Sequence, residues 1–245
     1  MLNKVWRSLA NATTLLIVAY SIAMALLESA VVVYLRQLYY PEGFVFPLRA
    51  MPLQLAGVEL ARELATLVMI ITVAWLAGNN RWTRFAWFLI IFAIWDLFYY
   101  VFLHVFIGWP TSLFDWDILF LIPVVWTGPV WSPLVLVMLM LLLGAALIHY
   151  NTKWVAPIQK WQWFFITSGS LICLGAFMYE FLLFALKFGP DPDAFDPNKW
   201  LTSFSPAYFP VLSFSVGVTL IAVGIVHYIR SNHISKKRIQ NSQLI

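Results

Sequence analysis

Six long apolar segments, separated by short polar stretches, dominate the pattern of this 245-residue chain. A helix of about 20 apolar residues crosses the roughly 30 Å hydrocarbon layer of a membrane. A transmembrane barrel would instead alternate apolar and polar residues over strands of about 10 residues. The continuous runs therefore predict an all-α polytopic transmembrane helix bundle that forms one integral membrane domain over residues 1–245. The six predicted spans cover residues 13–35, 53–77, 82–107, 130–150, 161–188 and 207–229.

A seventh apolar stretch, residues 118–126, is too short to cross a membrane. It is broken by Pro123 and followed by Gly128 and further prolines. Because exposed non-helical backbone is not tolerated in lipid, we predict a short re-entrant or interfacial segment here. Ser112 or Asp115 could cap a short helix in this segment, which would then cover a pocket as a lid. An ordinary interfacial loop is the alternative.

Small residues are placed for close packing in the last two predicted spans. Ser213, Gly217 and Gly224 lie on roughly one face of the last span, which predicts a close approach to a neighbouring helix. The single cysteine, Cys173, lies in the middle of a span, and we interpret it as a small packing residue. One cysteine also excludes a disulfide framework within the chain.

Composition supports the membrane interpretation and excludes some partners. Hydrophobic residues make up 62% of the chain and charged residues only 11%, whereas ordinary soluble domains contain about 25% charged residues. The net charge of +4 comes mainly from basic residues at the ends of spans, not from a basic stripe on a folded surface. We therefore expect membrane lipids as partners, with further membrane subunits as a second possibility, and no nucleic acid.

Lysine and arginine also predict how the chain is oriented. The positive-inside rule places the more basic connections in the cytoplasm. The N-terminus, the second and fourth connections and the C-terminal tail carry Lys4, Arg7, Arg81, Arg84, Lys153, Lys160, Arg230, Lys236, Lys237 and Arg238. The opposite segments carry only Arg36, Arg49, Lys187 and Lys199. We therefore predict a multi-pass protein of a bacterial inner membrane with both termini in the cytoplasm.

Six charged residues fall inside the predicted spans, where charge is costly and by default marks function. With the predicted orientation, all of them lie in the outer half of the bilayer, and the cytoplasmic half contains almost none. They are Glu28, Glu59, Arg62, Glu63, Asp96 and Glu180. This asymmetry predicts a polar site that is open to the outer side only.

Helical spacing groups these charges into stripes. Glu59, Arg62, Glu63 and Thr66 follow the i, i+3, i+4, i+7 pattern of one helix face. Asp96, Tyr99, Tyr100 and His104 form a similar stripe on the third span. Each stripe must turn away from lipid, so we predict that the stripes meet in one polar pocket. Arg62 is then expected to be its only fixed cation.

The charge count within this pocket suggests its chemistry. One arginine cannot neutralise five carboxyl groups, so some of the acids are expected to be protonated or bound to a cation. Alternatively, the acids hydrogen-bond to neighbouring side chains and only fix helix packing. The candidate acid–base or proton-relay residues are Glu59, Glu63 and Asp96, and the candidate binding residues are Glu28, Arg62, Tyr99, Tyr100, His104, Asp117 and Glu180.

We expect neither a bound transition metal nor another cofactor. The only nitrogen donor among the stripes, His104, lies two helical turns beyond Asp96, roughly 12 Å along the axis. The second span also lacks the Glu-x-x-His pattern of di-iron bundles, because Arg62 occupies the histidine position. Arg62 would in addition repel a metal cation.

Three functions remain open on the sequence alone. The first is a membrane-embedded enzyme that acts on a lipid or isoprenoid from the outer leaflet, with a carboxyl group as general acid. The second is proton or cation transfer, which needs a path through the cytoplasmic half, where Thr72, Ser168 and Ser170 are weak candidates. The third is an accessory or structural subunit of a larger membrane complex.

Overall fold

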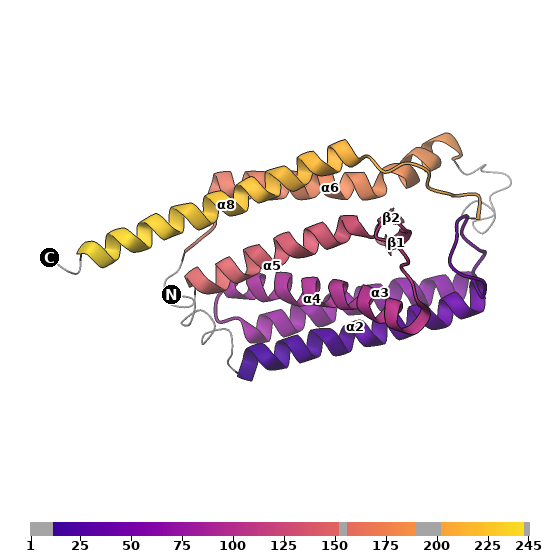
Figure 1. Ribbon diagram of the computed structural model, residues 1–245, viewed down its shortest axis with the longest axis horizontal. Coiled ribbons are helices and arrows are strands. Elements are labelled where there is room, and N and C mark those ends of the chain that lie inside the picture. Colours follow the sequence, from indigo (N-terminus) through magenta and orange to yellow (C-terminus); the bar gives the residue numbers. More distant parts are fainter. Residues whose placement is uncertain (1–11, 152–155, 190–201, 243–245) are drawn as a thin grey trace.

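The computed structural model describes residues 12–151, 156–189 and 202–242. Six long helices are present in these ranges (Figure 1), and all six are long and apolar enough to cross a membrane. They are α2 (Ala12–Tyr39), α3 (Leu53–Ala77), α4 (Arg81–Ile107), α5 (Trp131–Asn151), α6 (Lys160–Lys187) and α8 (Val211–Ser242). The prediction of a six-helix membrane protein is confirmed. Of the basic residues used to predict orientation, Lys4, Arg7, Lys153 and Lys199 lie outside the described ranges.

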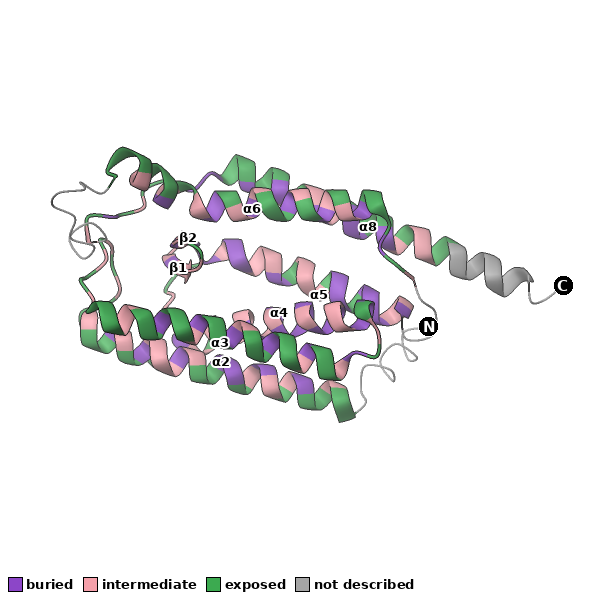
Figure 2. Ribbon diagram, turned by 180° about the vertical axis from the view of Figure 1, so that it is seen from behind, coloured by how far each residue is buried: buried purple, intermediate pink, exposed green. Residues whose placement is uncertain are grey.

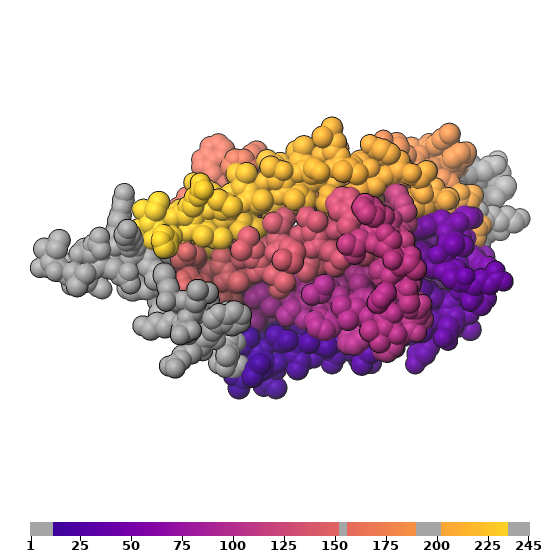
Figure 3. All heavy atoms as spheres, viewed as in Figure 1, coloured from indigo at the N-terminus to yellow at the C-terminus, as the bar shows by residue number. Residues whose placement is uncertain are grey.

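Helix α4 is the central element of one part of the bundle, where it packs against α2, α3 and α5. Its sequence fixes both ends: the Asn80 side chain accepts hydrogen bonds from the backbone of Trp82 and Thr83, and Gly108 adopts the left-handed conformation at the C-terminus. Helix α8 packs mainly on α6 and also contacts α5. Exposed residues follow the outward faces of α2 and α3 (Figure 2), as expected for helices in lipid. Side chains close the space that the ribbons leave between α5 and α8 (Figure 3).

The contact between α6 and α8 depends on glycines, as the small-residue pattern predicted. A Cβ atom added at Gly169 of α6 would lie 2.5 Å from the carbonyl oxygen of Gly217 of α8. A Cβ atom at Gly217 would lie 2.6 Å from the Sγ atom of Cys173, and one at Gly224 would lie 3.1 Å from the carbonyl oxygen of Gln162. Only glycine allows the two backbones to approach this closely.

We expect Gly169→Ala to lower the free energy of unfolding by about 1–3 kcal/mol, because the new methyl group forces α6 away from α8. Gly175→Ala on the same helix is the matched control, since a Cβ atom there meets nothing within 4 Å. It should leave stability unchanged or raise it by up to about 1 kcal/mol through helix propensity. Unfolding by SDS in mixed micelles measures both variants. Equal stabilities would contradict the close approach.

The segment between α4 and α5 differs from the prediction. It forms an antiparallel hairpin of β1 (Trp116–Phe120) and β2 (Trp126–Pro129), with Asp117 opposite Gly128. The predicted short helix is therefore wrong. Pro123 removes a backbone donor that a helix would need, and the aromatic and β-branched residues of β1 favour a strand. Asp115 does not cap a helix; its Oδ2 atom accepts hydrogen bonds from the backbone of Thr111 and Ser112 just before the hairpin.

The hairpin lies between the two parts of the bundle. Strand β2 contacts α6 and α5, and the ring of Trp126 stacks on Phe177 of α6 with centroids 6.3 Å apart. Strand β1 leads into a connection whose Leu121 backbone N–H donates to the Oε2 atom of Glu63 of α3 at 3.0 Å. The hairpin thereby closes one end of the space between α2, α3 and α4.

Candidate functional site

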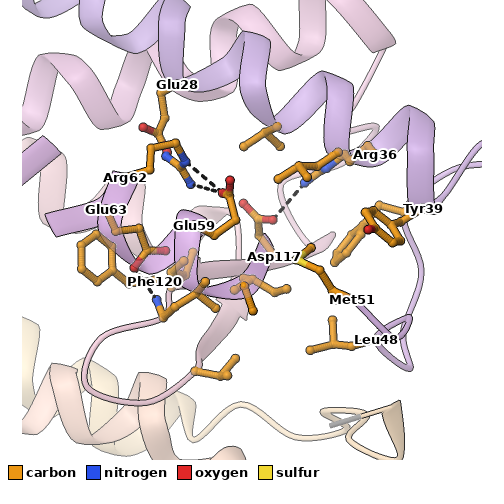
Figure 4. A pocket seen from close by; sticks show the side chains of 18 of the residues that line it. Glu28, Arg36, Tyr39, Leu48, Met51, Glu59, Arg62, Glu63, Asp117 and Phe120 are labelled. Carbon is orange, nitrogen blue, oxygen red and sulfur yellow. Dashed lines mark hydrogen bonds and ion pairs between the residues drawn. The ribbon is translucent and has the colours of Figure 1, made fainter. Parts of the chain in front are cut away.

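A cavity of about 270 Å³ lies between α2, α3, α4, the hairpin and the connection from α2 to α3 (Figure 4). Most of its wall is apolar or aromatic, and the polar part consists mainly of charged side chains and tyrosines. The charged residues in the wall are Glu28, Arg36, Arg49, Glu59, Arg62, Glu63, Asp96 and Asp117. The cavity therefore contains most of the candidate residues of the sequence analysis, supplied by four separate elements.

Arg62 is held by two carboxylates in this wall. Its Nη2 atom lies 2.8 Å from Oε2 of Glu59, one helical turn earlier on α3, and its Nε atom donates to the same oxygen at 2.9 Å. Its Nη1 atom pairs with Oε1 of Glu28 on α2. The hydroxyl of Thr66 donates to the other Glu28 oxygen at 3.4 Å. The i, i+3, i+7 spacing on α3 thus places one ion-pair cluster at the contact with α2.

Two carboxyl groups in the wall have no counter-ion within the described part of the chain. Glu63 is buried and accepts one hydrogen bond, from the backbone of Leu121. Asp96 lines the cavity without an ion pair or hydrogen bond to any described residue. Because no cation of the described chain pairs with them, these two carboxyl groups are the ones in the cavity that can hold a proton for acid–base chemistry.

A second ion pair, between Arg36 and Asp117, was not predicted. The Nη2 atom of Arg36, near the end of α2, donates to Oδ1 of Asp117 on β1 at 3.0 Å. The guanidinium also lies over the ring of Trp109, 3.6 Å from its centroid, and faces Phe44 at 4.7 Å. The prediction that Arg62 is the only cation of the pocket is therefore wrong.

The sequence contains an indication that Arg36 has a partner inside the bundle, although Arg36 was used above only to predict membrane orientation. Arg36 follows Glu28 by eight residues, close to two helical turns, so both side chains lie on one face of α2. It is also one of the few basic residues on the side where the positive-inside rule expects few. A basic residue that opposes this rule and shares a face with a buried acid predicts a partner inside the bundle.

The Arg36–Asp117 pair is buried but incompletely satisfied. Nη1 of Arg36 and Oδ2 of Asp117 are both buried without a hydrogen-bond partner in the described residues. Burial raises the pKa of Asp117 to about 6, against the opposing effects of Arg36, the backbone N–H of Ile118 and the nearby hydroxyls of Tyr100 and Tyr99. Those hydroxyls lower the pKa through hydrogen bonding to the carboxyl group, while Oδ2 itself has no hydrogen-bond partner in the described residues. A buried acceptor without a donor costs free energy unless a ligand or water supplies one.

Two candidate binding residues lie away from the cavity. His104 is exposed, and its Nδ1 atom lies 3.0 Å from the carbonyl oxygen of Pro110 beyond the end of α4. Glu180 of α6 accepts a hydrogen bond from the backbone of Ala207 at 3.1 Å, next to the start of α8. Neither residue lines the cavity. Tyr99 and Tyr100, in contrast, lie in its wall together with Trp95, which was not predicted.

The donor set does not resemble a metal centre. Within the residues that the structure describes, no group of three or more His, Cys, Asp or Glu side chains is placed to hold a metal ion. Arg36 and Arg62 lie among the carboxylates and place positive charge where a metal would sit. The absence of a tightly bound metal remains a prediction that elemental analysis of the purified protein can test.

Comparison of the chain with protein families, with curated proteins and with solved structures gives no match. The function must therefore be argued from the cavity and its residues.

Proposed function

We propose that this protein is a membrane-embedded enzyme that draws a lipid or isoprenoid amphiphile into the cavity and acts on it by acid–base chemistry. The observation that carries the proposal is the combination of an apolar wall with two carboxyl groups, Asp96 and Glu63, that have no counter-ion in the described chain. An apolar wall with a few convergent polar groups is the usual form of a small-molecule site. The orientation that opens this cavity to the outer leaflet is part of the proposal and rests on the lysine and arginine distribution.

The residues of the cavity have different roles in the proposed reaction. Asp96 and Glu63 are the candidate general acid and base, since a carboxyl group in an apolar cavity can hold and release a proton. Glu59 is less suited to proton transfer, because both the Nε and Nη2 atoms of Arg62 bind its Oε2 atom. Arg62 and Glu28 instead hold α2 and α3 together around the cavity, which keeps the reacting groups in place.

Proton or cation transfer would need a polar path through the half of the helix bundle that lies beyond the cavity. There the core is apolar, and it includes Ile17, Ile70 and Leu147. The three hydroxyl residues that could extend a polar path, Thr72, Ser168 and Ser170, each donate to a carbonyl of their own helix. None of these three hydroxyls lines the cavity, so they do not extend its polar wall. A cavity whose charged residues lie toward one end of the helices suits binding and catalysis better than transfer.

The test combines native mass spectrometry with a lipid assay. Protein purified in a mild non-ionic detergent is first examined for co-purifying lipids and chains, and is then incubated with a total lipid extract whose masses are followed over time. We expect a bound amphiphile and a lipid product of changed mass. Asp96→Asn and Glu63→Gln should each lower product formation by roughly 100-fold or more, and Glu63→Gln should do so while the bound amphiphile is retained. Glu180→Gln, a carboxyl group outside the cavity, should behave as the wild type.

Three results would overturn the proposal. The first is that no lipid changes mass with the wild type. The second is equal product formation by the wild type, Asp96→Asn and Glu63→Gln. The third is a stoichiometric co-purifying protein chain with no bound amphiphile, which would assign the protein to the accessory subunits.

A further inference from the structure

The charge of the cavity wall limits what polar group can enter it. Five carboxyl groups face three arginines. Of these arginines, Arg49 is exposed and its guanidinium faces the ring of Tyr40 at 5.6 Å. The wall therefore carries an excess of acidic groups, which favours a cationic group over an anionic one.

The other two arginines of the wall, Arg62 and Arg36, already pair with carboxylates. Arg62 pairs with both Glu28 and Glu59, and Arg36 pairs with Asp117 while its guanidinium also contacts the rings of Trp109 and Phe44. A phosphate or carboxylate ligand that binds Arg36 or Arg62 would have to break one of these pairs and strand its acid. Of the nitrogen atoms of these two guanidinium groups, Nη1 of Arg36 is buried without a partner in the described residues, and a neutral oxygen of a ligand can satisfy it.

The acceptors without partners are concentrated between α4 and β1. Asp117 is 98% buried, and its Oδ2 atom has no donor in the described residues. Figure 4 shows its carboxylate pointing into the cavity from β1. Asp96 of α4 lines the same cavity without a partner and is close enough for the charge of Asp117 to act on it. Two acids that repel each other are stabilised by a cation between them.

The neighbouring aromatic residues are also suited to an organic cation. Trp95, Tyr99 and Tyr100 lie next to the two aspartates in the wall. Aromatic faces attract ammonium groups, whereas a metal ion would require more oxygen ligands than two aspartates supply. The apolar wall formed by Val32, Leu35 and Leu53 continues to the surface at Leu53, which is exposed. The alkyl part of a ligand can follow this side.

We infer that the cavity binds the ammonium group of an amphiphile between Asp96 of α4 and Asp117 of β1. Resting on the proposed function, this assigns an amine-headed lipid as the substrate of the enzyme. The ammonium donates to Oδ2 of Asp117 and to the carboxylate of Asp96, and the alkyl chain follows the apolar wall between α2 and α3.

Binding of matched twelve-carbon probes tests the inference. Isothermal titration in one non-ionic detergent compares dodecylamine with dodecanol and dodecyl phosphate, and ethanolamine represents a free amine without a chain. We expect dodecylamine to bind at least about tenfold more tightly than each of the other three probes. Asp117→Asn and Asp96→Asn should each weaken dodecylamine binding by roughly 30-fold or more. Glu180→Gln should leave it unchanged, since Glu180 lies outside the cavity. If Asp117→Asn does not fold, the dodecylamine affinity of Asp96→Asn alone tests the inference.

The outcomes separate this inference from the proposed function. Equal or tighter binding of dodecanol or dodecyl phosphate overturns the ammonium site, as does dodecylamine affinity that both variants retain. Turnover of an uncharged or anionic lipid would overturn the ammonium site but would still support the proposed enzymatic function. Selective amine binding without any lipid product would support the ammonium site and overturn the enzyme. If ethanolamine binds as tightly as dodecylamine, the ligand is a free amine, and the inference that it is a lipid is overturned.

Discussion

Replacing Arg62 by leucine is expected to lower the free energy of unfolding by roughly 3 kcal/mol. The change leaves Glu28 and Glu59 facing each other without their shared cation. Removing one partner of a buried ion pair costs about 3–5 kcal/mol, because the remaining charge is neither hydrated nor paired. The lower end applies here, since the Arg62 side chain remains 21% exposed. Unfolding by SDS in mixed micelles measures this difference.

Arg81→Leu is the matched control for this prediction. Arg81 is exposed at the start of α4 and has no ion pair among the described residues. Its replacement should change stability by less than about 1 kcal/mol. A triple variant that combines Arg62→Leu with Glu28→Gln and Glu59→Gln should recover part of the loss, because it removes the stranded charges as well. Equal stability of Arg62→Leu and Arg81→Leu would show that the cluster does not hold α2 against α3.

The six helices were predictable because the membrane sets one simple physical requirement. Each span must satisfy its backbone internally and present apolar side chains over about 30 Å, and both properties are visible as long apolar runs. The face of α3 was predictable for a related reason. Glu59, Arg62 and Glu63 are too costly to face lipid, so their helical spacing alone turned them inward, where Glu59 and Glu63 are buried.

The hairpin was harder to predict because its determinants are not local. Residues 118–126 are apolar and short, and a helix or a strand fits such a run equally well by periodicity. Its backbone is satisfied partly by a side chain far away in the sequence, since Glu63 accepts the N–H of Leu121. A second long-range contact pairs Asp117 with Arg36, and no sequence spacing reveals this pairing.

The candidate site was predicted where charge and helical period agreed, and missed where they did not. His104 shares the period of Asp96 on α4, but it lies near the end of the helix, where the carbonyl of Pro110 is available and the cavity is not. Arg36 was used only as one of the few basic residues on the less basic side of the membrane when orientation was predicted. Aromatic residues such as Trp95 and Phe44 gave no signal, because such residues are frequent throughout this chain.

The largest expected effect concerns Arg36 and Asp117, whose side chains are only 9% and 2% exposed. Arg36→Leu should cost about 3–5 kcal/mol, since it strands the carboxylate of Asp117 in a dry environment and also uncovers Trp109 and Phe44. Arg36→Lys should be intermediate, because an ammonium keeps the charge but lacks the planar guanidinium that lies over the ring of Trp109. Asp117→Asn should cost less than Arg36→Leu, as the amide retains an oxygen acceptor for Arg36.

A double-mutant cycle separates the ion pair from the packing. With Arg36→Leu and Asp117→Asn combined, the loss should be smaller than the sum of the two single losses by about 2–3 kcal/mol, since the stranded charge is absent from the double variant. The part of the Arg36→Leu loss that persists in the double variant then reports the lost contacts with the aromatic rings. Additive losses would mean that the pair contributes no coupling. In that case apolar packing would hold the hairpin against α2, and the hydrogen bond from Leu121 to Glu63 would hold it against α3.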